Sequence, residues 1–303
     1  MPILHGMAEQ AMHGGQVAPD GSAQRVPRVA LTGELPAQLS RDVRTLAVDL
    51  GERNLRDAPR FFRLERAATF LEERLRQAGL PFTRQAFRAG ALGVRNLEVE
   101  LPGAHHPDEV VVVAARYDSR VGSAGVNDNA TGAAALLALA QRCAARRVPA
   151  RSVRFVALPT GPHTPLPGAR VYAARLRERG VRVRGVLCLE ALGCGVGAAA
   201  EPLMVVSNLA SRRLARTVTW ALQQGEAPLR SRAAFVPGVL PALRHSDPGA
   251  FWECGWPAVR VTQTFPLSAW RADAGVEQLD YARLARVVQG LERVVERLVL
   301  GEH

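Results

Sequence analysis

Charged side chains follow an apolar run in the stretch 110–139, at a spacing that suits a functional site. Residues 110–115 are all apolar, Arg116 and Asp118 come directly after them, and Asp128 lies in a nearby Asn- and Gly-rich segment. Carboxylates can bind a metal ion or move a proton, and a guanidinium can bind carboxylates as an ion pair. These three residues are therefore the first candidates for chemistry.

The elements around them predict how they are positioned. Residues 110–115 read as a buried strand, and the Ala- and Leu-rich run that ends at Leu139 reads as a helix. Ligands of open α/β sheets bind outside the carboxyl ends of the strands, where the intervening loop would lie. The strand is apolar throughout, as expected when helices cover both sheet faces. A simpler alternative for Asp128 is that it only caps the helix that follows.

Strand and helix patterns alternate along the rest of the chain. We expect helices at 40–52, 58–78, 168–179, 209–224 and 281–300, and a hairpin of strands at 81–88 and 94–101. Further strands are expected at 152–158, 181–189, 202–207 and 257–262, and residues 225–245 give no clear pattern. The alternation predicts a three-layer α/β fold, with a mainly parallel, doubly wound sheet between helices. We expect a flexible tail over residues 1–37 and one domain over 38–303.

The composition is that of a globular protein with an unusual charge. The chain has 303 residues, 48% of them hydrophobic, and a formal net charge of +11. All 39 basic residues are Arg, and they alternate with Glu along the helices instead of forming a basic block. Nucleic-acid binding is therefore disfavoured, and the lack of Lys excludes a lysine nucleophile. No signal peptide or bilayer-length apolar run is seen, so we expect a cytoplasmic protein without membrane contact.

Several motifs resemble metallopeptidase family twenty-eight, the di-zinc aminopeptidases that include bacterial leucyl aminopeptidases and are related to glutaminyl cyclases. The segment Ala115-Arg116-Tyr117-Asp118-Ser119 is similar to the family pattern A-H-Y-D-S, and residues 127–132 are similar to N-D-N-A-S-G. The resemblance extends over residues 40–300. It implies a zinc-exopeptidase-like fold whose metal ligands come from the ends of separate strands.

Matched to the family residue by residue, three metal-site positions fall on strand ends and the loop between them. Asp128 is matched to the aspartate that bridges the two zinc ions. Glu190 is matched to an aspartate ligand, and Arg116 is matched to the histidine ligand of the first zinc. A guanidinium stays protonated and offers no lone pair to a metal ion.

The other three positions depart further from the family. Pro162 is matched to the glutamate that acts as general base, His163 to a glutamate ligand, and Trp270 to the last histidine ligand. Proline has no titratable group and cannot transfer a proton at neutral pH. We therefore predict a catalytically inactive member of the fold, with no cofactor, whose former cleft binds a peptide or protein partner or serves only structure.

Within this hypothesis, Arg116 replaces the metal ion. Buried carboxylates without a counter-charge are costly, so the guanidinium is expected to pair with Asp128 or Glu190. Asp118 and Asp247 are expected beside the same site.

Two other readings remain open. A remodelled hydrolase or glutaminyl-cyclase-like enzyme could hold a single zinc with Asp128, His163 and Glu190. Asp118, Asp247 or His245 would then supply the base. The third reading is Arg-mediated binding of nucleic acid or another anion.

Overall fold

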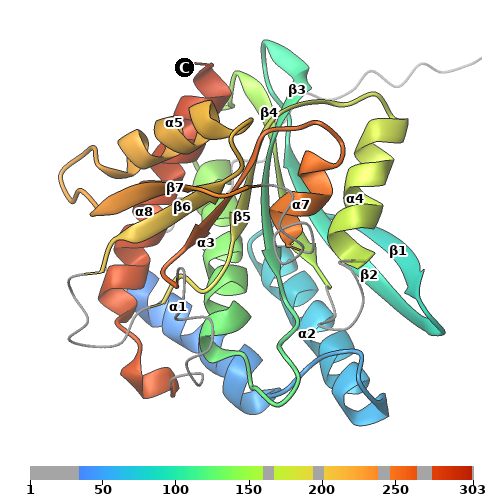
Figure 1. The fold of residues 1–303 in the computed structure, drawn as a ribbon. Helices are drawn as coiled ribbons and strands as arrows, with labels where there is room; N and C mark the ends of the chain where they lie inside the picture. The colour runs from blue at the N-terminus through green and yellow to red at the C-terminus, as the bar shows by residue number, and fades with distance from the viewer. Residues whose placement is uncertain (1–33, 160–166, 194–200, 238–245, 265–274, 302–303) are drawn as a thin grey trace, which may run out of the picture.

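An eight-stranded mixed sheet with helices on both faces forms the framework of the protein (Figure 1). The computed structural model describes residues 34–159, 167–193, 201–237, 246–264 and 275–301. The strands are β1 (Thr83–Ala89), β2 (Leu92–Leu101), β3 (His106–Arg116), β4 (Arg151–Leu158), β5 (Arg182–Leu189), β6 (Leu203–Ser207), β7 (Ser231–Phe235) and β8 (Ala258–Thr262). The principal helices are α1 (Leu35–Arg44), α2 (Ala58–Gln77), α3 (Gly132–Ala144), α4 (Pro167–Glu178), α5 (Arg212–Leu222), α7 (Asp247–Trp252) and α8 (Tyr281–Leu300).

Parallel strands occupy the centre of the sheet. The order is β1-β2-β4-β3-β5-β8-β6-β7, and β4, β3, β5 and β8 run parallel to one another. Strands β1, β2 and β6 pair antiparallel with their inner neighbours, so antiparallel pairings lie on both sides of the parallel centre. The predicted α/β fold with a mainly parallel central sheet is confirmed. In the central register Ala115 lies opposite both Ala157 and Leu189. The carboxyl ends of β3, β4 and β5 therefore meet at one edge.

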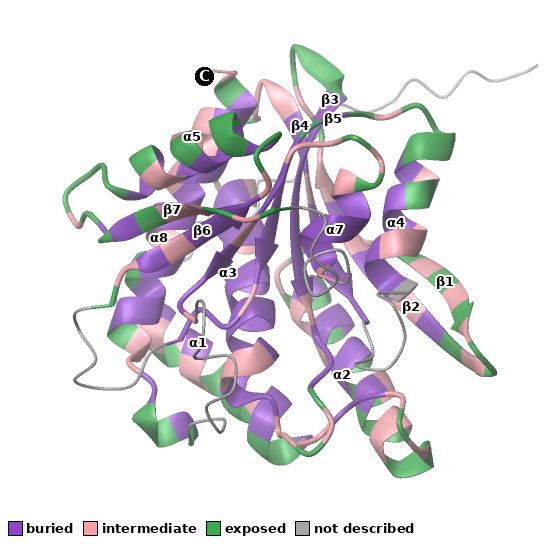
Figure 2. Ribbon diagram, in the orientation of Figure 1, coloured by how far each residue is buried: buried purple, intermediate pink, exposed green. Residues whose placement is uncertain are grey.

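The apolar run of β3 is buried on both of its faces (Figure 2). Val111, Val113 and Ala115 belong to the core packed under α1, α2, α3, α5 and α8. The alternate residues Val110 and Val112 belong to a second core, under α4 and α7. Successive side chains of a strand point to opposite faces, so a strand between two helix layers needs an apolar residue at every position.

The N-terminal boundary differs from the prediction. Helix α1 begins at Leu35 and continues as a π-helical turn over Thr45–Asp49, whereas the sequence pattern predicted a tail to residue 37 and a helix over 40–52. Pro36 suits the first turn of a helix, where its missing N–H costs nothing. Residues 1–33 of the predicted tail lie outside the described residues. The ambiguous segment 225–245 contributes strand β7 at the sheet edge.

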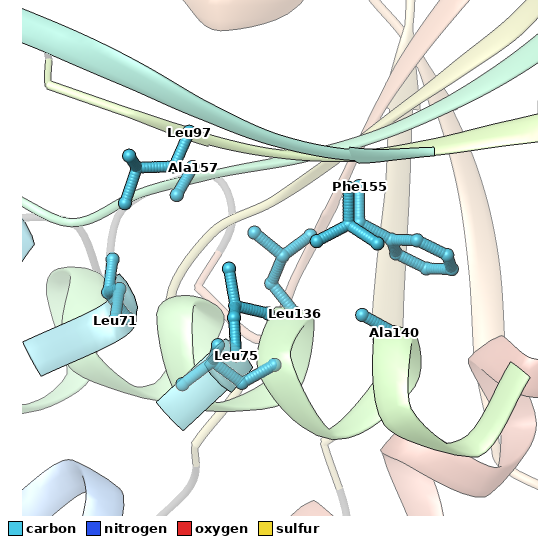
Figure 3. A pocket seen from close by; sticks show the side chains of 9 residues that line it. Leu71, Leu75, Leu97, Leu136, Ala140, Phe155 and Ala157 are labelled. Carbon is cyan, nitrogen blue, oxygen red and sulfur yellow. The ribbon is translucent and has the colours of Figure 1, made fainter. Parts of the chain in front are cut away.

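A small cavity lies between α2, α3 and the sheet (Figure 3). Its volume is about 20 Å³, and it is lined only by apolar residues: Leu71, Leu75, Leu97, Val99, Leu136, Leu137, Ala140, Phe155 and Ala157. The cavity offers no polar side chain to a ligand and belongs to the core. Within the described ranges, no helix is long and apolar enough to cross a membrane.

Candidate functional site

Arg116 lies at the centre of a group of carboxylates at the carboxyl end of β3. Its guanidinium is in direct ion-pair contact with Asp128. It also lies 3.4 Å from an oxygen of Asp118 and 3.6 Å from an oxygen of Asp247. The side chains of Arg116, Asp118 and Asp247 are 14%, 1% and 6% exposed, so these charges face one another and not solvent. The predicted pairing of Arg116 with Asp128 is confirmed.

The loop that carries Asp128 is held against the end of β5 by polar side chains. The amide nitrogen of Asn129 donates to the carbonyls of Arg116 and Leu189 at 3.1 and 3.0 Å, and its oxygen accepts from the N–H of Ala191 at 3.0 Å. Asn127 exchanges two hydrogen bonds with the backbone of Gly193. These bonds join the two strand ends and bring Asp128 close to the segment that begins with Glu190.

The same loop shows why the motif contains a glycine. A Cβ atom on Gly132 would lie 2.4 Å from the side-chain oxygen of Asn129, which leaves no room for a larger residue. Helix α3 begins at Gly132, and its N-cap Thr131 makes no side-chain cap hydrogen bond. The alternative that Asp128 merely caps this helix is therefore wrong, because Asp128 lies earlier in the loop and pairs with Arg116.

Glu190 follows β5 directly and has a partner that the sequence did not reveal. An oxygen of Glu190 lies 3.4 Å from a guanidinium nitrogen of Arg260 in β8. Arg260 is the one charged residue of the largely buried strand β8, and it pairs in register with Cys188. The sequence held one indication that Arg260 belongs to the site, namely a charged residue within a predicted strand next to the candidate residues.

Asp247 reaches the group from the opposite helix layer. It is the first residue of α7, and one of its oxygens faces Arg116. Its other oxygen, Oδ1, is buried and has no hydrogen-bond partner among the described residues. The expectation that Asp118 and Asp247 lie beside Arg116 agrees with this geometry.

Burial and neighbouring charges shift the pKa values of Asp118, Asp247, Glu190 and Arg116 in opposite directions. Burial raises the pKa of the Asp118 and Asp247 carboxyls to about 7, although Arg116 opposes that shift in both. Burial also acts to raise the pKa of Glu190, but Arg260 and Arg116 outweigh it and the pKa lies below its ordinary value. Burial disfavours the charge of Arg116, but the surrounding carboxylates raise its pKa well above the ordinary value.

Arg53 holds the loop that carries Asp118 in place, and it was not among the site residues predicted from the sequence. It is fully buried, and its guanidinium donates to the carbonyl of Tyr117 at 2.7 Å, of Leu46 at 2.8 Å and of Ala124 at 2.7 Å. Its backbone N–H donates to the hydroxyl of Ser119 at 3.0 Å. These hydrogen bonds connect the N-terminal helices to the loop that carries Asp118. No spacing of residues in the sequence indicates that they form.

Four residues of the predicted site, Pro162, His163, His245 and Trp270, lie outside the described residues. In the described part of the chain, no group of three or more His, Cys, Asp or Glu side chains is arranged to hold a metal ion. The histidines described, His105 and His106, lie at the opposite end of β3 from Arg116. Among the described residues, the side chains around Arg116 form a buried ion-pair cluster.

Comparison with known proteins relates most of the chain to one peptidase family. The model of peptidase family M28 matches residues 96–289. A probable zinc metalloprotease of Pyricularia oryzae is 35% identical over 116 residues, which are 36% of this chain and 23% of that relative. The uncharacterized protein YfbL of Escherichia coli is 27% identical over 292 residues, covering 84% of this chain and 86% of YfbL. The chain thus spans less than a quarter of the first of these relatives and most of the second.

Solved structures show the same fold at low identity. A zinc aminopeptidase from Bacillus subtilis superposes with a TM-score of 0.68 and 13% identity, over 86% of this chain and 94% of that chain. A glutaminyl cyclase from Fimbriiglobus ruber superposes with a TM-score of 0.60 and 20% identity, over 86% of this chain and 94% of that chain.

Proposed function

This chain belongs to peptidase family M28, and we propose that it is a member without zinc-dependent peptidase activity, in which a guanidinium takes the place of a metal ion. The observation that carries the proposal is the ion-pair cluster of Arg116 with Asp128, Asp118 and Asp247. Asp128 is matched by resemblance to the bridging zinc ligand. A metal ion at that carboxylate would have to displace a guanidinium already in contact with it.

Charge balance supports this substitution. Carboxylates that converge in a buried site repel one another unless a positive charge lies between them. The planar fork of a guanidinium provides that charge and can face several carboxylates at once. By resemblance, Arg116 lies where the family has a histidine ligand. The single replacement of that histidine by arginine would therefore remove a zinc ligand and supply the counter-charge.

The sequence matches at two further positions support the loss of turnover. By resemblance, Pro162 takes the position of the general base and Trp270 that of the last histidine ligand. Neither side chain can transfer a proton or donate a lone pair to zinc in the way that those roles need. We propose that the region around Arg116 binds a peptide or protein partner without hydrolysis, with a purely structural role as the alternative.

Metal content and activity of the same preparation test the proposal. The protein is purified without chelator, its zinc is quantified, and release from aminoacyl-arylamide reporters is followed with and without added zinc. We expect less than stoichiometric zinc and no release. Zinc-dependent release that disappears in the Asp128→Ala variant would refute the proposal.

A second candidate is an enzyme with one metal ion, as in the glutaminyl-cyclase reading. The observation that favours it is that Asp128 and Glu190 are retained at neighbouring strand ends, joined by the hydrogen bonds of Asn129. His163 would complete the ligand set, and zinc would then act as a Lewis acid. Cyclisation of an N-terminal glutamine peptide in the presence of zinc, lost in His163→Ala, would support this candidate over the first.

A further inference from the structure

Arg260 and Arg116 approach Glu190 from the two strands that flank β5. Strand β5 lies between β3 and β8 and pairs with both of them in parallel. Glu190 directly follows β5, and its N–H donates to the carbonyl of Val261 at 3.1 Å, which extends the pairing with β8 by one residue. Glu190 therefore has an arginine on each neighbouring strand, Arg116 at the end of β3 and Arg260 within β8.

The two arginines and Glu190 share the face of the sheet that α7 covers. Arg260 lies opposite Cys188 in register, and Glu190 points to the same face because it follows Cys188 by two residues. Cys188 belongs to the core under α4 and α7, and α7 packs against both β5 and β8. Arg116 reaches this face as well, where it meets Asp247 of α7. Three charged groups from three adjacent strands are thus placed beneath one helix.

Each of the two arginines contacts a carboxylate of its own. The guanidinium of Arg116 contacts Asp128, whereas Nη1 of Arg260 lies 3.4 Å from Oε1 of Glu190. The side chains of Arg260 and Glu190 are 19% and 21% exposed, so water screens their attraction only in part. By resemblance, Asp128 and Glu190 are the two carboxylates matched to zinc ligands in the described part of the chain. Both of them are occupied by a guanidinium.

The fold of β8 does not require an arginine at this position. Val259 and Val261, on either side of Arg260 in the strand, are fully buried, and Ala258 belongs to the same core as Cys188. A charged side chain in such a strand loses hydration and is tolerated only beside a counter-charge. An apolar residue at position 260 would suit the strand better, and it would leave Glu190 open to a cation.

We propose that Arg260 is a second determinant of metal exclusion, which occupies Glu190 as Arg116 occupies Asp128. This inference rests on the proposed loss of zinc binding, and it adds that two strands share in that loss. A zinc ion that used both carboxylates as ligands would have to displace both guanidiniums. The change Arg116→His therefore restores only part of the affinity for zinc.

Zinc affinities of matched variants, measured by competition with a chromophoric chelator, test this inference. We expect Arg116→His to bind zinc weakly and R116H/R260M to bind it about tenfold or more tightly, which is the usual effect of a group that adjoins a metal ligand. Methionine is long and apolar, as the strand requires. The variant R116H/R260K keeps a positive charge and should bind zinc no more tightly than Arg116→His. Arg260→Met alone should bind no more zinc than wild type, because Arg116 still contacts Asp128.

Two further variants keep the test decisive. R116H/R260Q replaces R116H/R260M if thermal melts show that the latter does not fold. R116H/R154M removes an arginine that pairs with Glu100 at 3.0 Å, and it should leave the zinc affinity of Arg116→His unchanged.

The outcomes separate this inference from the proposed function. Equal zinc affinities of Arg116→His and the neutral double variants at position 260 would overturn the role of Arg260. Equal affinities of R116H/R260M and R116H/R260K would overturn it too, since the charge would then have no effect. Stoichiometric zinc in the wild type would refute the proposed function and this inference with it. A wild type free of zinc, with no gain in the double variants, would refute this inference alone.

Discussion

Replacing Arg116 with alanine removes a positive charge in contact with Asp128 and leaves the buried carboxyls of Asp118 and Asp247 without that charge beside them. Arg116 lies 3.4 Å from Asp118 and 3.6 Å from Asp247. At these separations, each of the two ion pairs has a Coulomb energy of roughly 5 kcal/mol at an effective dielectric constant of about 20. Part of the loss is recovered when the carboxyls take up protons. Breaking a buried pair by removing one partner costs about 3–5 kcal/mol, which is the destabilisation we expect at alkaline pH.

Denaturant unfolding of wild type and Arg116→Ala at pH 8 and pH 5 measures this effect. The destabilisation should be smaller at pH 5, because the Asp118 and Asp247 carboxyls, whose pKa burial raises to about 7, are then protonated and need no counter-charge. Arg154→Ala is a suitable control, since Arg154 is 15% exposed, like Arg116, but has Glu100 as its ion-pair partner at 3.0 Å, itself 37% exposed. That variant should lose only about 1 kcal/mol. Equal stability of Arg116→Ala and wild type at both pH values would refute the role given to the guanidinium.

Four further changes test the site and the core. Arg116→His should retain more zinc than wild type after dialysis, because an imidazole can donate a lone pair where a guanidinium cannot; equal retention would argue against this position as a former ligand. The Asp247 carboxyl keeps its proton to about pH 7 in the folded chain, against about 3.8 when unfolded, so stability falls as pH rises through that window. Asp247→Asn should flatten this fall in thermal melts, and an unchanged slope would contradict the assignment. Asn129→Ala should cost roughly 2–4 kcal/mol in urea unfolding, since it leaves two carbonyls and one N–H at the strand ends without their partner. Ala157→Val should stabilise the fold by about 0.5–1.5 kcal/mol and raise the melting temperature, because valine suits a strand and fills part of the cavity; a lower melting temperature would mean that the cavity cannot accept it.

The sequence by itself determined the elements and their order. The uninterrupted apolar run that begins at Val110 predicted a strand covered on both faces, and the helix predicted at 281–300 agrees with the observed α8. Such patterns are local, because burial of one face repeats every two residues in a strand and about every 3.6 in a helix. The motif around Asp128 also indicated the family, and with it the edge of the sheet where a site would lie.

Only the tertiary structure showed the partner of Glu190. Arg260 comes from β8, far along the chain, yet it faces Glu190 across the strand ends. Ion pairs depend on distances of a few ångströms in space and have no characteristic spacing in sequence, so no pattern could show that Arg260 would pair with Glu190.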